Sequence, residues 1–298
     1  MKFLKLALAL LFASVATAQT YGERLGWGPD DRILIIHSDD LGMSLASNQG
    51  TIEGLEFGTI SSTSMMMPTP WVVGFNAYLK EHPDVDVGLH LTMTSEFDHY
   101  RWVPVAGKNQ VPGLTDKDGC LPDGAKEVYA NATPDEVEKE IRAQLDRALS
   151  MGIKVSHTDS HMGILFRNQP IFERWLKVTL ETKIPMLMMG AHPAAKQVWD
   201  AGLPVIDYLH TDSYDWKTTD KSDLYIDAFK NLKPGITEMI IHATKPDDVI
   251  GVITGGRDQL YGDYNAMVDP RVKQALQDEK IILTNWRELQ ERRNKAAK

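Results

Sequence analysis

The fold is decided by the stretch Arg32-Ile33-Leu34-Ile35-Ile36-His37-Ser38-Asp39-Asp40-Leu41-Gly42, in which an apolar run leads directly into two adjacent aspartates. The uninterrupted apolar run predicts a buried strand. Two carboxylates at the exit of such a strand are a catalytic candidate, because one can bind a metal ion while the other handles protons. For the pair taken alone, the alternative is turn chemistry or a solvated acid pair.

Three other apolar runs end in a histidine. They cover residues 85–90, 153–157 and 239–242, and they end in His90, His157 and His242. The second run continues into a cluster that also holds His161. If the strands are parallel neighbours, these side chains converge on one rim. Carboxylate and imidazole in threes are the usual ligands of a catalytic zinc or a related divalent ion. A single histidine of this kind is more typical of a core or capping position, but the set predicts a metalloenzyme.

Strands and helices alternate along the rest of the chain, and the strands look continuously apolar. This pattern is typical of a parallel sheet covered by helices. A closed or nearly closed α/β barrel fits better than a dinucleotide-binding sheet, because no Gly-x-Gly-x-x-Gly follows the first strand. Further strands are expected at 59–67, 184–189, 203–208 and 280–284, and helices at 44–57, 70–80, 133–152, 168–181, 191–201, 221–231, 270–277 and 286–294.

Two long segments are rich in glycine and aromatic residues and are expected to be loops. The first, 94–131, leaves the rim beside His90 and is interpreted as a substrate-facing flap with an aromatic stacking surface, the alternative being a passive insertion. The second, 251–264, resembles it in glycine and aromatic content.

The first 18 residues have the pattern of a secretory signal peptide: a basic start, a short apolar run and a small-x-small site at Ala16-Thr17-Ala18. We expect cleavage there, export to a periplasm or the medium, and a single barrel domain over 19–298; the alternative is a retained anchor. Loss of Lys2 and Lys5 would take the net charge from −9 to −11, which makes nucleic acid a poor partner. The sole cysteine, Cys120, excludes an intramolecular disulfide, and no later run predicts a membrane span.

Taken in order, these motifs resemble the YdjC-like carbohydrate deacetylases, relatives of the polysaccharide deacetylases. The resemblance rests on the segments 38–42, 88–92 and 157–161 and on the late strand that ends in His242. It covers nearly all of the chain after the signal peptide. It implies an irregular, TIM-like (β/α) barrel of about seven strands and metal-dependent removal of N-acetyl groups from amino sugars of oligosaccharides or glycan fragments.

The resemblance also implies a role for each residue. Asp40, His90 and His161 would hold the metal, and His157 would orient ligands or replace His161 as the third one. Asp39 would be the general base. His242 would protonate the departing amine or donate to the tetrahedral oxyanion. In the competing arrangement both aspartates bind the ion.

The expected cofactor is one divalent metal ion. Asp-His-His ligation suits zinc and tolerates magnesium, cobalt, nickel or manganese. The expected partner is an N-acetylated sugar, and the sequence makes no prediction of the oligomeric state.

This chain departs from the family pattern at His37, where many members carry Asn or Ala, and after Asp159-Ser160-His161 and His242, where Met162-Gly163 and Ala243-Thr244 follow. These changes affect the substrate more than the metal. Two other function classes therefore stay open: a metal-dependent barrel hydrolase for another ester or amide, and a non-catalytic sugar-binding protein.

Overall fold

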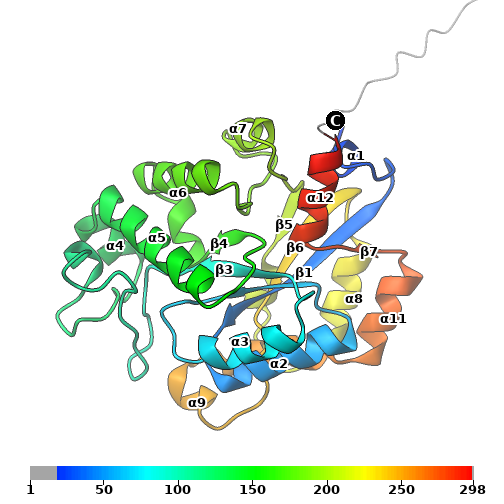
Figure 1. The fold of residues 1–298 in the computed structure, drawn as a ribbon. Coiled ribbons are helices and arrows are strands. Elements are labelled where there is room, and N and C mark those ends of the chain that lie inside the picture. The colour runs from blue at the N-terminus through cyan, green and yellow to red at the C-terminus, as the bar shows by residue number, and fades with distance from the viewer. Residues whose placement is uncertain (1–18, 297–298) are drawn as a thin grey trace, which may run out of the picture.

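A computed structural model describes residues 19–296. The signal peptide predicted at 1–18 lies outside the described residues. A parallel sheet curls through the centre, and helices surround it (Figure 1). The strands are β1 (Arg32–Leu41), β2 (Ser62–Met65), β3 (Val87–Leu91), β4 (Thr158–Ser160), β5 (Tyr208–His210), β6 (Gly235–Ile241) and β7 (Ile282–Leu283).

The sheet has the order β4-β3-β2-β1-β6-β5, and every pairing in it is parallel. Two isolated parallel bridges, Thr158 to Met186 and Met189 to Ile206, extend the sheet from β4 toward the segment that precedes β5. Strand β7 pairs with β1 at Ile33 and Leu34. This confirms the predicted α/β class and the irregular TIM-like barrel.

Each helix predicted from the sequence is present. The helices are α1 (Tyr21–Arg24), α2 (Leu45–Phe57), α3 (Val72–Glu81), α4 (Ala125–Asn131), α5 (Pro134–Ser150), α6 (Gln169–Thr182), α7 (Ala195–Asp200), α8 (Ser222–Lys230), α9 (Ile250–Ile253), α10 (Arg257–Met267), α11 (Pro270–Asp278) and α12 (Trp286–Ala296). Of these, α1, α4, α9 and α10 are additional to the predicted ones. Helix α5 begins as expected, with Thr133 and Glu136 exchanging the two bonds of a capping box. No helix within residues 19–296 is both long enough and apolar enough to cross a membrane.

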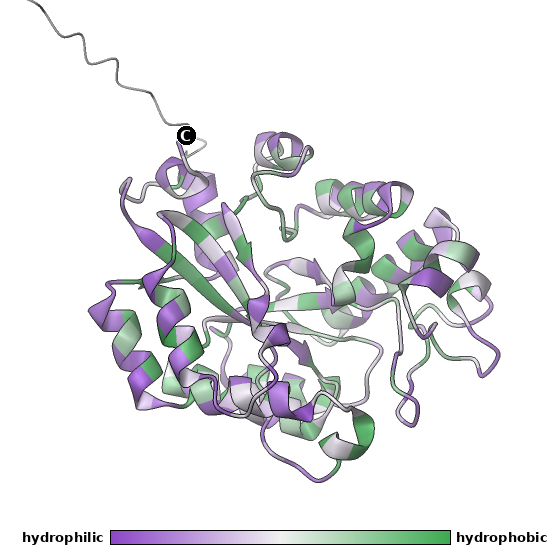
Figure 2. Ribbon diagram, turned by 180° about the vertical axis from the view of Figure 1, so that it is seen from behind, coloured by the Kyte–Doolittle hydropathy of each residue, from purple (hydrophilic) through white to green (hydrophobic). Residues whose placement is uncertain are grey.

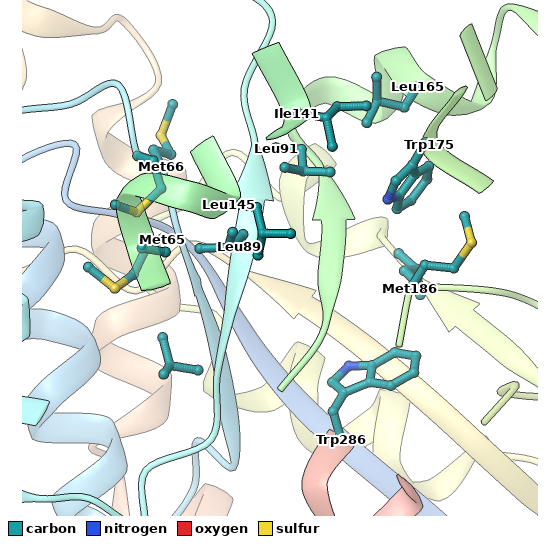
Figure 3. Packing of buried hydrophobic residues seen from close by; sticks show 14 of the residues in the cluster. Met65, Met66, Leu89, Leu91, Ile141, Leu145, Leu165, Trp175, Met186 and Trp286 are labelled. Carbon is teal, nitrogen blue, oxygen red and sulfur yellow. The ribbon is translucent and has the colours of Figure 1, made fainter. Parts of the chain in front are cut away.

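The core fills the space between the sheet and the helices. Figure 2 shows hydrophobic residues along the central strands, whereas single helices carry both hydrophobic and hydrophilic residues. Buried side chains from β2, β3, α5 and α6 meet there, and Trp286 of α12 comes in from the end of the chain (Figure 3). The apolar faces of the helices thus pack against the sheet and hold the carboxyl ends of its strands in place.

The run 153–157 was expected to be a strand, and this was wrong. Ile153 closes α5 instead, since its N–H donates to the Ala148 carbonyl, and strand β4 begins only at Thr158. His157 therefore lies before the strand and His161 directly after it. The runs at 184–189 and 203–208 are also not strands over their length, since 184–189 makes only isolated bridges and β5 starts at Tyr208.

Segment 94–131 is irregular over most of its length, as predicted, up to α4. The second predicted loop and the aromatic surface of the first need correction. Segment 251–264 is largely helix. Position 262 of α10 requires glycine, because a Cβ there would collide with the Thr218 carbonyl. In segment 94–131 the aromatic residues do not form a stacking surface. Trp102 is buried and donates to the Thr94 carbonyl over 2.8 Å, and Tyr100 donates to the Met43 carbonyl over 2.5 Å. The aromatic side chains anchor this segment to the core.

Candidate metal centre

The two aspartates that follow the apolar run lie in an irregular part of β1. The pairing of β1 with β2 shifts register between Ser38 and Leu41, and Asp40 has the left-handed value φ = 64°. In a regular strand, neighbouring side chains point to opposite faces. A bulge re-aims one of them. Asp tolerates left-handed backbone better than most residues, so the irregularity brings both carboxylates to the same polar cluster.

Three of the predicted residues converge where β1, β3 and β4 end. Asp40 Oδ1 lies 3.4 Å from His90 Nε2 and 3.3 Å from His161 Nδ1, and the two nitrogens are 3.1 Å apart. Ligand atoms about 2.0–2.1 Å from one zinc ion are themselves about 3.3 Å apart when tetrahedral. Asp40 Oδ1 is buried and has no hydrogen-bond partner among the described residues. The three atoms therefore fit a divalent metal ion.

In each ligand histidine, a second carboxylate contacts the ring nitrogen that does not face Asp40. His90 Nδ1 lies 2.6 Å from Asp159 Oδ1, and His161 Nε2 lies 3.0 Å from Glu96 Oε1. Such partners fix the ring and leave its other nitrogen free for the ion. The sequence offered Asp159 only as part of the histidine cluster. Glu96 was missed, because it comes from the long segment after β3 and no spacing links it to His161.

The charges of the cluster favour a cation. Burial by itself would raise the pKa of Asp40, but the adjacent imidazoles of His161 and His90 hold it well below its usual range. Burial would likewise lower the pKa of His161, but the charge of Glu96 and the adjacent Asp40 carboxylate raise it to about 9. The imidazoles thus supply positive charge in the metal-free protein, at the place where an ion would supply it.

Asp39, the predicted base, lies beside the three ligand atoms and is not one of them. Its Oδ1 is 3.0 Å from His37 Nε2 and 3.7 Å from His90 Nδ1, and it accepts a hydrogen bond from Ser64 Oγ over 3.3 Å. The carboxylate is almost fully buried. Because these contacts all use Oδ1, Oδ2 is the atom that is left to accept a proton.

His242 follows β6 and stands near the same cluster, where its charge helps to lower the pKa of Asp40. Its backbone N–H donates to Asp263 Oδ2 over 2.9 Å, and Asp263 pairs with the buried Lys221 over 2.7 Å. Its ring meets the exposed ring of Tyr214, with the centroids 5.5 Å apart. Its Nδ1 is buried without a partner among residues 19–296. The backbone of His242 is thus fixed, and its ring keeps one nitrogen without a partner among the described residues.

His157 lies in a different part of the polar cluster. Its ring stacks on Trp286 of α12, with centroids 5.0 Å apart, and its Nδ1 lies 2.9 Å from Ser156 Oγ. Burial lowers its pKa. It groups with His37 and Asp159 and not with the atoms around Asp40. Of the two candidate third ligands, the structure places His161 with Asp40 and His90.

Glu238 of β6 is a buried acid that the sequence did not single out. Burial, together with the charges of Asp159, Asp39 and Asp86, raises its pKa to about 8, although His37 opposes the shift. Glu238 Oε1 lies 3.8 Å from His37 Nδ1. The carboxyl group is therefore protonated in the folded protein at neutral pH.

This raised pKa predicts how stability depends on pH. Below the usual value of 4.5 Glu238 is protonated in both states, and between 4.5 and about 8 only the unfolded chain ionises, so the folded protein loses stability as pH rises. Glu238→Gln should therefore stabilise the protein at pH 9 more than at pH 5, measured by urea unfolding. The exposed Glu173→Gln is the control, and an equal effect of Glu238→Gln at both pH values would contradict the prediction.

Comparisons with known proteins agree with this architecture. The YdjC-like protein family matches residues 33–278. A carbohydrate deacetylase from Thermoanaerobacter pseudethanolicus is 25% identical over 256 residues, covering 86% of this chain and 98% of that protein. One from Thermus thermophilus is 27% identical over 280 residues, covering 90% and 97%.

Among solved structures, a proposed cellobiose-phosphate cleavage protein from Enterococcus faecalis superimposes with a TM-score of 0.74 at 21% identity. The superposition covers 87% of this chain and 99% of that one, which establishes a shared fold. With the family match extending from β1 to the end of α11, the chain belongs to the YdjC-like protein family.

Proposed function

We propose that this protein is a metal-dependent carbohydrate deacetylase that hydrolyses the N-acetyl amide of amino sugars in oligosaccharides or glycan fragments. The observation that carries the proposal is the triangle of Asp40, His90 and His161, with the separate carboxylate of Asp39 beside it. The curated relatives named as carbohydrate deacetylases support the substrate class.

The three ligand residues would hold the ion through Asp40 Oδ1, His90 Nε2 and His161 Nδ1. When bound, the ion supplies Lewis acidity, which an amide carbonyl and a water molecule both need. Zinc is the ion that we propose, with magnesium, cobalt, nickel or manganese as alternatives, because the donor set is one carboxylate and two imidazoles.

The remaining residues handle protons. Asp39 takes the proton of the attacking water at a carboxylate oxygen, since its position beside the ligands puts a base within the site. His242 gives a proton to the departing amine nitrogen or donates to the tetrahedral oxyanion. Its Nδ1, which has no partner among the described residues, and its closeness to Asp40 suit either role. Asp159 and Glu96 keep the ligand imidazoles in orientation.

The direct test is acetate release from N-acetylglucosamine oligomers by protein that has been stripped of metal and then reloaded with zinc. We expect acetate only after reloading. Metal bound at one ion per chain without acetate would refute the deacetylase and favour a hydrolase of another ester or amide. Acetate release that is unaffected by stripping would refute the metal centre.

We also propose that the protein is exported, on the basis of the signal-peptide pattern of residues 1–18. The amino-terminal sequence of the protein recovered from cells decides this, since export predicts a start at Gln19, and a start at Met1 would contradict it.

A further inference from the structure

His37 is a buried imidazole in the middle of β1, and the mechanism above does not use it. Its Nε2 lies 3.0 Å from Asp39 Oδ1 and also 3.0 Å from Asp159 Oδ2. No part of the side chain is exposed to solvent. A single nitrogen therefore sits between the proposed base and the carboxylate that orients His90.

The hydrogen bonds around His37 fix its protonation state. Ser62 Oγ donates to Asp86 Oδ1 over 2.6 Å and lies 2.9 Å from His37 Nδ1. Because the single hydroxyl hydrogen of Ser62 is used, its oxygen accepts from Nδ1–H. Nε2 faces two carboxylate oxygens and also lies 3.1 Å from Ser64 Oγ, whose hydroxyl donates to Asp39 Oδ1. Because the Ser64 hydrogen is used in this way, Nε2 has only acceptors around it and also carries a proton. Both ring nitrogens are donors, and His37 is an imidazolium.

A continuous chain of contacts then runs from the base to the metal site. Asp39 Oδ1 contacts His37, His37 contacts Asp159 Oδ2, and Asp159 Oδ1 lies 2.6 Å from His90 Nδ1. Without a cation between them, the two buried carboxylates would repel each other and each would lose a partner.

We propose that His37 is a positioning residue that locks Asp39 and Asp159 to one another, and so sets the base at a fixed place relative to the metal ligand His90. This role rests on the proposed function, because it acts through the base of that reaction. A base must be held within a fraction of an ångström of its working position, which explains why a charged side chain is buried here.

Kinetics of zinc-loaded protein test the coupling. We expect His37→Gln to lower kcat about 10–100-fold, as is typical for residues behind metal ligands, with KM and the metal content of one ion per chain little changed. If His37 acts through Asp39, the double variant His37→Gln/Asp39→Asn should be no slower than Asp39→Asn alone. His192→Gln is the control, since this partly buried imidazole packs on Phe172, away from His37, Asp39 and Asp159. Its effect should add to that of Asp39→Asn.

Nuclear magnetic resonance of histidine-labelled, metal-free protein tests the geometry without relying on activity. Wild type should show a doubly protonated imidazole that belongs to His37, in addition to any from the ligand histidines, with N–H protons shifted far downfield by hydrogen bonds to carboxylates. These signals should vanish in His37→Gln and shift in Asp39→Asn. His37→Asn serves as a second variant if His37→Gln does not fold.

Three outcomes would overturn the proposal. An unprotonated nitrogen on His37 would remove the bridging cation, and additive effects of His37→Gln and Asp39→Asn would remove the coupling. A second metal ion per chain that is lost in His37→Gln would make His37 a ligand, since His37, His157 and Asp159 also lie close enough to hold an ion. The resonance result stands even if the protein releases no acetate, so the two proposals can fail separately.

Discussion

Asp39→Asn is expected to lower kcat for acetate release about 10²–10⁴-fold, the usual loss when a general base is removed. Asn has the shape of Asp and can keep a contact with Ser64, but it cannot take a proton from water. Because Asp39 is not part of the triangle around Asp40, the variant should still bind one metal ion per chain. Steady-state kinetics and elemental analysis of the same preparation measure both quantities.

Asp227→Asn is the matched control, because Asp227 lies on α8 with 70% of its side chain exposed and should leave the rate unchanged. Two results would contradict the prediction. Full activity of Asp39→Asn would mean that another group accepts the proton. Loss of the metal together with the activity would favour the competing arrangement, in which both aspartates bind the ion.

The second large effect is expected at the third ligand. His161→Gln should weaken metal binding by more than about 100-fold, since it removes a direct ligand. Substitution of a residue that only contacts a ligand lowers metal affinity by about 10–100-fold. His157→Gln should keep one ion per chain and lose stability instead, because its ring packs between His37 and Trp286. Metal titration followed by calorimetry measures the affinity, and thermal unfolding measures the stability.

The comparison of these two variants decides between the two histidines that sequence spacing left open. If His157→Gln loses the metal and His161→Gln keeps it, the triangle around Asp40 is not the metal centre. Equal losses in both variants, with a normal melting temperature, would indicate that the two imidazoles contribute to one larger site.

The sequence predicted the fold class and the main members of the cluster for identifiable reasons. The apolar run before Asp39 could only be a buried strand, and the capping box at Thr133 marks the start of a helix by local chemistry alone. Strands of a parallel sheet end at one rim, so Asp40 and His90 could be placed together without knowledge of any distance.

Other parts of the site depend on contacts between distant residues, and no local pattern reports them. Glu96 reaches His161 across 65 positions of the sequence, and Asp263 holds the backbone of His242 from inside a segment predicted as a loop. The aromatic content after His90 predicts a binding surface, because composition does not distinguish exposed rings from buried ones. His37 was noted only as a departure from the family pattern, since its importance lies in its partners on other strands.

Strand β1 shares one edge between two partners, with β7 at Ile33 and Leu34 and β2 from His37 onward. Of the seven strands, β1, which carries both aspartates, is therefore synthesised first, and its partner β7 is synthesised last. Trp286, which supports His157, follows only a few residues after β7. A nascent chain that ends before residue 282 lacks both β7 and Trp286. The site around Asp39 and Asp40 can therefore be completed only after the last part of the chain has been synthesised.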